Sequence, residues 1–317
     1  MAMSTTPEGE PEVPSPGWTA ADIPQLDGRT FIVTGGNSGL GFETCRALAA
    51  KGAQVILAAR DPEKGQEAVA RIVAEHPAAT VETRVLDLAD LDSVEVFAAG
   101  IREVDVLINN AGVMMPPRTT SAQGYELQFA VNHLGHFALT ARLLDVLAQG
   151  ADPRVVTVTS FLHRRGRIHF DDLHGEHKYS RTGYYSQSKL ANVVFGLELH
   201  RRLRLNGVPL TSVLAHPGYA ATNLQSSGPS GLMKLALKVS NRLSAQDAEM
   251  GALPQLFAAV SQDVEGGQLI GPDGRKEQKG YPKVVSPLEA ARDRELAKRL
   301  WDTSEELTGV AFGLAAR

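Results

Sequence analysis

The amino-acid sequence predicts an α/β protein with a single doubly wound domain, in which helices cover both faces of a seven-stranded parallel sheet. Two observations lead to this fold class. Short apolar and β-branched runs alternate with helical patterns from residue 29 to about residue 270, the rhythm of strand–helix–strand units. No Pro- or Gly-rich stretch in that range is long enough for a linker, so we expect one domain although the chain has 317 residues.

Each element of the predicted sheet follows from this alternation. Strands joined by crossover helices run parallel and form a sheet that is covered on both faces. The predicted strands span residues 30–34, 54–59, 80–87, 104–109, 154–160, 208–215 and 267–270. The predicted helices span residues 39–52, 62–75, 90–103, 121–148, 182–206 and 244–261.

The two ends of the chain lie outside the alternation. Residues 1–24 are rich in Pro and Glu and lack apolar periodicity, so they are predicted to form a flexible tail before a domain that spans residues 25–317. A helical extension is expected around residues 286–306, because Ser286, Pro287 and Glu289 together form a helix start signal.

The composition excludes several kinds of protein. Lys and Arg number 32 against 36 Asp and Glu, a formal net charge of −4 that argues against a nucleic-acid partner. The single cysteine, Cys45, lies in an apolar helical run and is expected to be a buried, inert thiol. No run approaches the roughly 18 apolar residues of a transmembrane segment, and the first basic residue is Arg29, so we expect a cytoplasmic protein without a signal peptide.

The strand at 30–34 leads directly into a Gly-rich turn and a helix. Glycines let the backbone approach a pyrophosphate, and the helix directs free N–H groups and the positive end of its dipole toward that group. Such a turn is also consistent with a tight connection alone, but this one follows the first strand of the series. The sequence therefore predicts a dinucleotide-binding turn made of Gly35, Asn37, Ser38, Gly39, Leu40 and Gly41.

The spacing Gly-x-x-x-Gly-x-Gly resembles that of the short-chain dehydrogenase/reductase family, and three further motifs match it. They are Asn109-Asn110-Ala111-Gly112, Tyr185-x-x-x-Lys189, and Pro217-Gly218 followed by Thr222. The resemblance covers nearly the full folded length and implies a Rossmann-type fold with a nicotinamide cofactor. The further cofactor contacts it implies are Asn110, Ala111, Gly112, Tyr185, Lys189, Pro217, Gly218 and Thr222.

The end of the second strand indicates which nicotinamide cofactor is used. An NAD-selective fold usually places an acid there for the ribose 2′-hydroxyl, whereas this chain has Ala58-Ala59-Arg60. A guanidinium binds a 2′-phosphate and stacks on adenine, so we expect NADP(H). The alternative is that Arg60 pairs with Asp61 or Glu63 on the surface.

The third strand ends at Asp87-Leu88, where the family resemblance implies contacts with the adenine edge. The alternative for Asp87 is an ordinary role as the N-cap of the following helix.

Tyr185 and Lys189 are the expected centre of the chemistry. A hydride moving between nicotinamide and a carbonyl carbon requires a proton at the oxygen, and a free tyrosine with a pKa of about 10 is a poor acid–base at neutral pH. Four residues apart on a helix, Lys189 lies on the same face as Tyr185 and is expected to lower its pKa. Tyr184 has only Ser188 at that offset. On their own, such pairs are common on solvated helix faces.

Two residues complete the predicted catalytic set. Ser160 stands at the carboxyl end of the fifth strand, where its hydroxyl is placed to bond a substrate oxygen, although a strand-end turn serine is the simpler interpretation. By the resemblance, Asn132 holds a backbone carbonyl and a water that relays protons to Lys189. Asn is unfavourable inside a helix, which fits a local distortion at this position. Asn132, Ser160, Tyr185 and Lys189 are therefore the predicted catalytic residues.

Two further segments have more than one interpretation. His174 and His177 lie three apart between Ser160 and Tyr185, but the loop lacks fixed ligand geometry and the chemistry needs no metal, so we predict no metal site. Residues 232–243 form a basic amphipathic stripe, interpreted as part of a mobile substrate lid around 223–243 or as a weak contact with a membrane surface.

The sequence as a whole predicts an NADP(H)-dependent oxidoreductase acting on the carbonyl or alcohol carbon of an apolar small molecule. Three features of the chain resemble the retinol dehydrogenase and protochlorophyllide reductase branch. They are the long gap between Ser160 and Tyr185, the sequence of residues 57–61 and the tail at 300–305. The alternatives are an NAD-dependent enzyme of the same fold and a non-catalytic NADP(H)-sensing protein. The resemblance also implies a homodimer or homotetramer, built on the helices that carry Asn132 and Tyr185.

Overall fold

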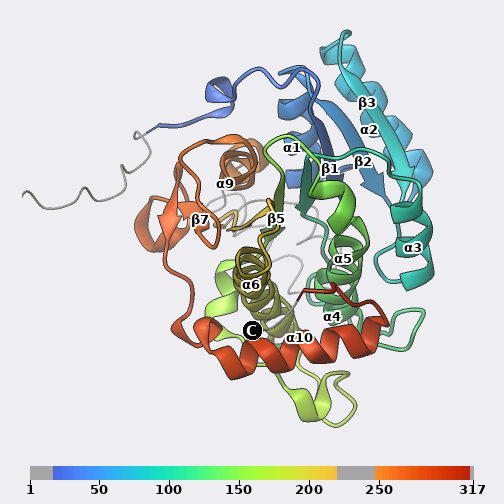
Figure 1. Ribbon diagram of the computed structural model, residues 1–317, viewed down its shortest axis with the longest axis vertical. Helices are drawn as coiled ribbons and strands as arrows, with labels where there is room; N and C mark the ends of the chain where they lie inside the picture. Colours follow the sequence, from blue (N-terminus) through green and yellow to red (C-terminus); the bar gives the residue numbers. More distant parts are fainter. Residues whose placement is uncertain (1–16, 220–246, 315–317) are drawn as a thin grey trace, which may run out of the picture.

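The computed structural model describes residues 17–219 and 247–314, which form one sheet with helices on both faces (Figure 1). The strand order is β3-β2-β1-β4-β5-β6-β7-β8. Strands β1 to β7 pair in parallel, and β8 runs antiparallel to β7. The strands are β1 Thr30–Thr34, β2 Gln54–Ala59, β3 Thr80–Val85, β4 Val106–Asn109, β5 Arg154–Val158, β6 Thr211–Ala215, β7 Leu269–Pro272 and β8 Pro282–Val285.

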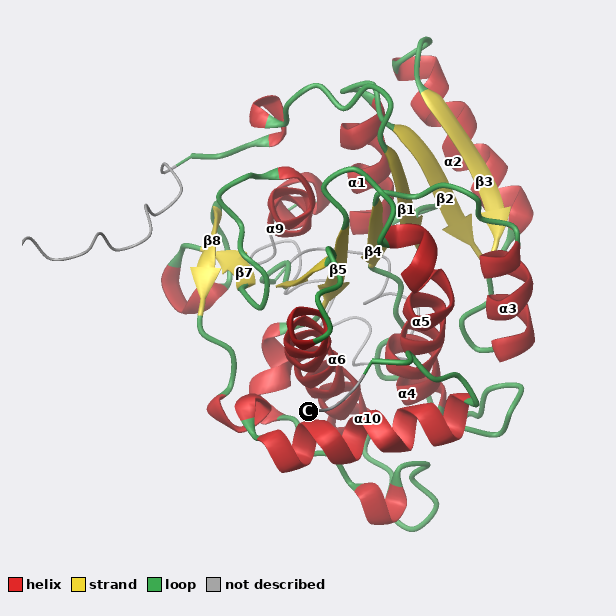
Figure 2. Ribbon diagram, viewed as in Figure 1, coloured by secondary structure: helices red, strands yellow, loops and turns green. Residues whose placement is uncertain are grey.

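The helices form two layers, with α1 and α9 on one side of the sheet and α5 and α6 on the other (Figure 2). The α-helices are α1 Gly39–Ala49, α2 Pro62–Glu75, α3 Leu91–Ala99, α4 Leu127–Phe129, α5 Gly135–Leu147, α6 Arg181–Leu205, α9 Ala248–Val260 and α10 Arg294–Thr308. Short 3₁₀ turns are η1 Ala20–Asp22, η3 Phe161–Arg165, η4 Phe170–Asp172, η5 Arg275–Glu277 and η6 Glu289–Arg292, and η2 Ala130–Leu134 is a π-helical turn.

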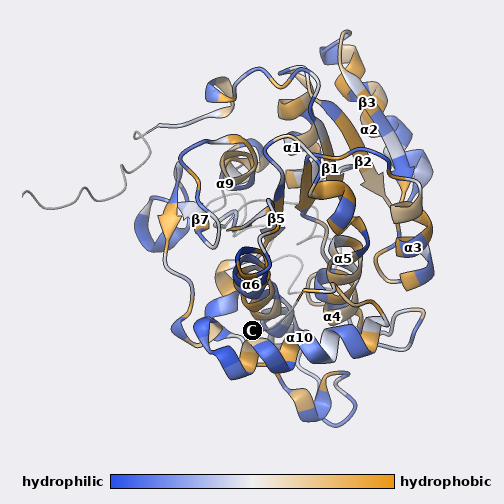
Figure 3. Ribbon diagram, viewed as in Figure 1, coloured by the Kyte–Doolittle hydropathy of each residue, from blue (hydrophilic) through white to orange (hydrophobic). Residues whose placement is uncertain are grey.

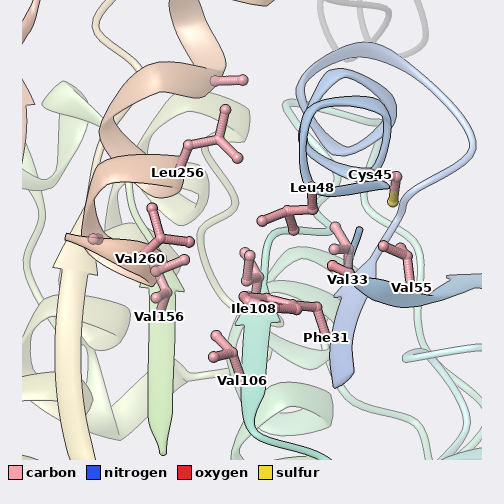
Figure 4. Packing of buried hydrophobic residues seen from close by; sticks show 14 of the residues in the cluster. Phe31, Val33, Cys45, Leu48, Val55, Val106, Ile108, Val156, Leu256 and Val260 are labelled. Carbon is pink, nitrogen blue, oxygen red and sulfur yellow. The ribbon is translucent and has the colours of Figure 1, made fainter. Parts of the chain in front are cut away.

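Alternate residues along each strand supply the two sides of the core. On the α1 and α9 side, Leu48 and Leu256 pack toward Val33, Ile108 and Val156 of the central strands (Figure 4). Cys45 belongs to this cluster and is buried as predicted, and burial raises the pKa of its thiol. On the opposite side, residues of α3, α5 and α6 pack against the alternate strand positions.

The predicted doubly wound α/β fold is confirmed, and one strand is added to the seven that we expected. Strand β8 escaped prediction because it is short, begins at Pro282 and lies at the edge of the sheet, where proline is tolerated. Five predicted strands also differ in their boundaries: β3 ends at Val85, β4 begins at Val106, β5 ends at Val158, β6 begins at Thr211 and β7 spans Leu269–Pro272.

The single helix predicted for residues 121–148 is wrong. Residues 121–126 are a loop, and the helical part is interrupted at residues 130–134 by the π-helical turn η2. A π turn holds one extra residue, which the periodicity of apolar residues does not reveal. Asn132 lies in the middle of this turn, at the position where its poor helix propensity indicated a distortion.

Both ends of the folded chain differ from the prediction. The flexible tail predicted for residues 1–24 includes residues that pack on the domain. Ile23 is buried, and the Trp18 ring lies 5.1 Å from the ring of Phe257 in α9, measured between centroids. At the other end, residues 289–292 form only the 3₁₀ turn η6. The main helix α10 then begins at Arg294, capped by the Asp293 carboxylate, which accepts bonds from two backbone N–H groups.

Helix α10 lies across α5 and α6 (Figure 1). Its Trp301 ring is 5.3 Å from Phe137 of α5, 6.0 Å from Phe195 of α6 and 4.6 Å from Phe312, measured between centroids. Polar and apolar residues are mixed along α10, as its colouring shows (Figure 3), and Leu300 and Trp301 are among its buried residues. The helices on which we expected a subunit contact are therefore packed against the chain's own C-terminal helix.

Candidate active site

The Gly-rich turn joins β1 to α1 through close backbone contacts. Gly35 has φ of +67°, and its N–H donates to the Ala58 carbonyl at 2.8 Å. A Cβ at Gly41 would lie 2.3 Å from the Gly35 carbonyl oxygen and 2.6 Å from Asn110 Nδ2, so only glycine fits. Ser38 is the N-cap of α1 without a side-chain capping bond, so the side chain leaves the first N–H groups of α1 available to a ligand.

The end of β4 is fastened to the end of β1 by a buried threonine and an amide. Thr34 Oγ1 accepts from the backbone N–H groups of Asn110 and Ala111, both at 2.9 Å. Asn110 Nδ2 donates to the Thr34 carbonyl at 2.7 Å, and Gln255 of α9 donates to Asn110 Oδ1 at 3.2 Å. These bonds hold the segment of residues 110–112 beside the Gly-rich turn.

Asn132 anchors the loop after β4 from within η2. Its Oδ1 accepts from the Val113 N–H at 2.7 Å, and its Nδ2 donates to the Val113 carbonyl at 3.0 Å. Its own backbone carbonyl lies 3.1 Å from His136 Nδ1. Because Thr34 Oγ1 already accepts two N–H groups, its hydroxyl donates to His136 Nε2 at 2.9 Å, and Nδ1 carries the ring proton that bonds Asn132.

Ser160, Tyr185 and Lys189 meet where β5 ends. Ser160 caps the turn η3, since its Oγ accepts from the Leu162 N–H at 3.2 Å, and its hydroxyl favours a lower pKa of the Tyr185 side chain. Lys189 Nζ donates to the Val158 carbonyl at 3.2 Å and lies 5.9 Å from the centroid of the Tyr185 ring. Tyr184, one residue earlier, instead directs its hydroxyl to the Asp172 carbonyl.

Burial controls the protonation of this pair. It raises the pKa of Tyr185 to about 12, against the opposing hydrogen bond from Ser160, and it lowers the pKa of Lys189 to about 8. We expected Lys189 to lower the pKa of Tyr185, and the structure differs because loss of water destabilises both charged forms. At neutral pH the phenol therefore keeps its proton.

A cavity of about 500 Å³ brings most of the predicted residues together. The predicted residues that line it are Gly35, Asn37, Ser38, Gly39, Leu40, Gly41, Asn110, Ala111, Gly112, Ser160, Tyr185, Lys189, Pro217 and Gly218. Sequence reasoning missed several others: Met114, Val158, Thr159, Phe161, Leu162, Arg165, Tyr219 and Gln278. Phe161, Leu162 and Arg165 lie in the long gap between Ser160 and Tyr185, where no motif singled out individual residues. Gln278 gave no signal, because it follows β7 in a loop whose partner strand was not predicted.

Among the described residues, four predicted ones lie outside the cavity wall: Arg60, Asp87, Leu88 and Asn132, the last of which bonds Val113 between the wall residues Gly112 and Met114. Arg60 is exposed at the carboxyl end of β2, and within residues 17–219 and 247–314 it forms no ion pair. Asp61 instead caps α2 and pairs with Lys64 at 2.9 Å. Asp87 accepts from the Ala89 N–H and is not the N-cap of α3, which is Asp90.

The remaining predictions concern Leu88, Thr222, the lid and the two histidines. Leu88 is buried, and its carbonyl lies against Gly135 of α5. Thr222 and the predicted lid at 223–243 lie outside the described residues. The His174 ring stacks on Tyr125 at 5.2 Å, and His177 lies 3.4 Å from Asp172.

A Gly-rich turn at the head of a parallel sheet, sharing one cavity with Ser160, Tyr185 and Lys189, defines a nucleotide-dependent oxidoreductase of the α/β class. A sequence profile of the short chain dehydrogenase family matches residues 29–231, and the chain belongs to this family.

Similarity to individual proteins indicates the branch of the family to which the chain belongs. The chain is 42% identical to human retinol dehydrogenase 13 over 296 residues, which cover 90% of this chain and 86% of the relative. It is 39% identical to mouse polyprenol dehydrogenase, with 92% of this chain and 87% of the relative covered. These similarities place the chain in the retinol dehydrogenase-like branch, whose members act on alcohol or carbonyl groups with a nicotinamide cofactor.

Solved structures share the fold. An uncharacterized protein from Mycobacterium paratuberculosis has a TM-score of 0.79 at 45% identity, covering 94% of this chain and 100% of that one. A short chain dehydrogenase from Shigella flexneri, complexed with NADP, has a TM-score of 0.62 at 21% identity, covering 78% of this chain and 98% of that one. Of the helices in residues 17–219 and 247–314, none combines the length and apolar character needed to cross a bilayer.

Proposed function

We propose that the protein transfers hydride between NADP(H) and the carbonyl or alcohol carbon of a bulky apolar substrate, with Tyr185 as the acid and base. The observation that carries this proposal is the single cavity of about 500 Å³, lined at one part by the Gly-rich turn and at another by Ser160, Tyr185 and Lys189. Its volume is within the range of small-molecule and cofactor sites.

The residues present fit a dinucleotide phosphate. No side chain fits at Gly41, because the Gly35 carbonyl and Asn110 lie against it. The N–H groups at the start of α1 suit a pyrophosphate. Arg60 is assigned to the 2′-phosphate, since its guanidinium lies one residue past β2 while Asp61 is engaged with Lys64. Lys189 is assigned to the nicotinamide ribose, and Thr222 to the carboxamide.

The side chains of the cavity supply the proton. When bound, NADPH provides the hydride that a carbonyl carbon accepts. Tyr185, which keeps its proton because burial raises its pKa to about 12, donates that proton to the substrate oxygen. Ser160 hydrogen-bonds the same oxygen, and Lys189, whose pKa is lowered to about 8 by burial, restores the proton to Tyr185. In the direction of alcohol oxidation the proton steps reverse: Tyr185 first passes its proton to the neutral amine of Lys189, and the resulting phenolate then accepts the proton of the alcohol.

The other walls favour an apolar substrate. Met114, Phe161 and Leu162 present apolar side chains to the cavity near Ser160 and Tyr185. The relatives named for retinol and polyprenol act on isoprenoid alcohols, which have this character. We infer that isoprenoid aldehydes and alcohols are the first substrates to test, retinal and retinol among them.

The test is turnover of a panel of aldehydes, ketones and alcohols with NADPH and NADH in parallel. Tyr185→Phe removes the proton-carrying hydroxyl and is expected to lower kcat by about 10²–10⁴-fold while NADPH binding stays within threefold. Tyr184→Phe is the matched control, because that hydroxyl bonds the Asp172 carbonyl and not the cavity. Near-normal turnover by Tyr185→Phe contradicts the assigned mechanism. Tight NADPH binding by the wild type without any turnover favours the sensing protein instead.

Arg60→Ala separates NADP(H) from NAD(H). We expect the KM for NADPH to rise about tenfold or more, since a charge-assisted contact with phosphate is lost, while the KM for NADH changes less than threefold. Arg102→Ala removes an exposed Arg at the opposite end of the sheet and serves as the control. Equal losses with both cofactors contradict the NADP(H) assignment and favour the NAD-dependent alternative.

A further inference from the structure

A polar cluster beside the cavity, in which His216 is fully buried and Arg164 and Glu277 are half-buried, has no role in the mechanism above. It consists of Arg164 from η3, His216 from the end of β6, and Glu277 from the loop between β7 and β8. Arg164 Nη2 donates to both oxygens of the Glu277 carboxylate, at 2.8 and 2.9 Å. His216 Nε2 lies 3.1 Å from Glu277 Oε2. The Glu277 carboxylate thus bonds two side chains that follow different strands of the sheet.

The orientation of the His216 ring is fixed on every side. The Gly218 N–H donates to Nδ1 at 3.2 Å, so Nδ1 is unprotonated and Nε2 carries the hydrogen that Glu277 accepts. The ring is fully buried and lies so close to β7 that a Cβ at Gly271 would be 2.2 Å from Nε2. Rotation of the ring would break both bonds at once.

The loop that presents Glu277 adopts an unfavourable backbone. Lys276 and Glu277 have φ of +56° and +55°, in the left-handed region that side chains other than Gly, Asn and Asp rarely occupy. Strain of this kind persists where the surroundings enforce it, and it is common near functional sites. Here the bonds to Arg164 and His216 hold the carboxylate inward. They also lower the pKa of Glu277 to about 2, so it stays ionised.

Each partner of Glu277 belongs to a segment that lines the cavity. Arg164 lies in η3 between Leu162 and Arg165, which both face the cavity. His216 directly precedes the turn at residues 217–219, which lines the cavity and whose Tyr219 N–H donates to the Gln278 carbonyl at 2.8 Å. Gln278 itself lines the cavity and follows Glu277. Three separate walls of the cavity therefore converge on one carboxylate.

We propose that Glu277 is a positioning residue for the reaction. Through Arg164 it holds η3, the apolar substrate wall that begins at Ser160, and through His216 it holds the turn at 217–219 against the cofactor. This inference rests on the proposed function, which assigns one wall to the substrate and the other to the cofactor. It predicts that neutralising Glu277 loosens both walls in a protein that remains folded.

The experiment compares Glu277→Gln with Glu289→Gln, the same chemical change at an exposed carboxylate of η6. We measure the dissociation constant of NADPH by its fluorescence, and KM and kcat for the best substrate of the panel, at a temperature where both variants are folded. For Glu277→Gln we expect NADPH to bind at least fivefold more weakly and kcat/KM to fall at least tenfold. Glu289→Gln is expected to stay within twofold of the wild type.

Arg164→Lys isolates one arm of the cluster. It keeps the positive charge but loses the two-oxygen contact, so we expect a three- to fivefold rise in substrate KM with NADPH binding unchanged. This variant also keeps the inference testable where Glu277→Gln fails to fold.

The outcomes distinguish this inference from the proposed function. A wild type that binds NADPH without turnover contradicts the proposed function, and weaker NADPH binding by Glu277→Gln still supports the positioning role. A folded Glu277→Gln whose NADPH binding and kinetic constants all stay within twofold of the wild type overturns the inference. So does an Arg164→Lys variant that loses stability without any change in KM.

Discussion

The two halves of the sheet build the cavity in different ways. On the side of β1 and β4, backbone groups and glycines approach each other directly, as in the bond from Gly35 to Ala58 and the contact of Gly41 with Gly35. On the side of β5 to β8, charged and polar side chains join segments far apart in the chain, as in Arg164 with Glu277. The first half depends on glycines at positions where no side chain fits, reinforced by bonds of Thr34 and Asn110, whereas the second depends on charged side chains. Mutations should therefore act on binding in one half and on positioning or stability in the other.

The largest expected effect lies at Trp301 of α10, in the helical layer that packs behind both halves. Its ring is fully buried among Phe137, Phe195 and Phe312, so Trp301→Ala should lower the free energy of unfolding by about 3–5 kcal/mol, measured by chemical denaturation. Trp18, the other tryptophan, is only half-buried against Phe257, and Trp18→Ala should cost less than half as much. A loss below about 1.5 kcal/mol at Trp301 would show that α10 is not an integral part of the core.

The next effect tests the first half. Gly41→Ala places a methyl group 2.3 Å from the Gly35 carbonyl oxygen, so the turn must shift, and the dissociation constant of NADPH should rise about 10–100-fold. Gly100→Ala is the control, since its Cβ would lie 3.4 Å from the nearest atom, and its NADPH affinity should match that of the wild type. Equal affinities of the two variants would mean that the turn does not hold the cofactor.

Asn132 lies between the two halves and should affect turnover more than binding. Asn132→Ala removes both bonds to Val113 and frees the loop that carries Gly112 and Met114 into the cavity. We expect kcat to fall about tenfold or more, because reacting groups tolerate little misplacement. Asn132→Asp keeps the acceptor for the Val113 N–H but loses the donor to the Val113 carbonyl. Its kcat should therefore lie between the kcat of Asn132→Ala and that of the wild type. Wild-type kcat in Asn132→Ala would contradict the anchoring role.

The smallest expected effect is a loss of stability in mild acid. Burial lowers the pKa of His133 to about 3 and that of His136 to about 4, below their ordinary value of 6.5. Below pH 6.5 the unfolded chain takes up protons that the folded chain refuses, so stability falls as the pH decreases toward 4. Each histidine should contribute about 1 kcal/mol of loss between pH 6.5 and 5.5, measured by denaturation at each pH. His133→Gln should make the free energy of unfolding depend less on pH in this range. An unchanged pH dependence would contradict the role assigned to His133.

The same contrast explains what the sequence could predict. The Gly-rich turn, residues 110–112 and the pair Tyr185 and Lys189 were accessible because each depends on local spacing along a strand end or a helix. The fold class followed from periodicity for the same reason. Glu277 was not accessible, since its position depends on bonds to His216 and Arg164, which are distant in the sequence. Strand β8 and the neighbouring Gln278 were missed because this short edge strand begins at Pro282 and gives little periodic signal. The π turn at Asn132 was indicated only by an unfavourable residue, because one inserted residue leaves the apolar pattern almost intact.

The position of α10 also has a consequence for synthesis of the chain. Phe137 and Phe195 leave the ribosome well before the helix that covers them, which begins at Arg294. Until then an aromatic surface between α5 and α6 is exposed to other nascent chains, a situation in which chaperones commonly intervene. A chain that stops before Arg294 would keep the complete cofactor turn and the Ser160, Tyr185 and Lys189 set, yet it should aggregate before either could be used.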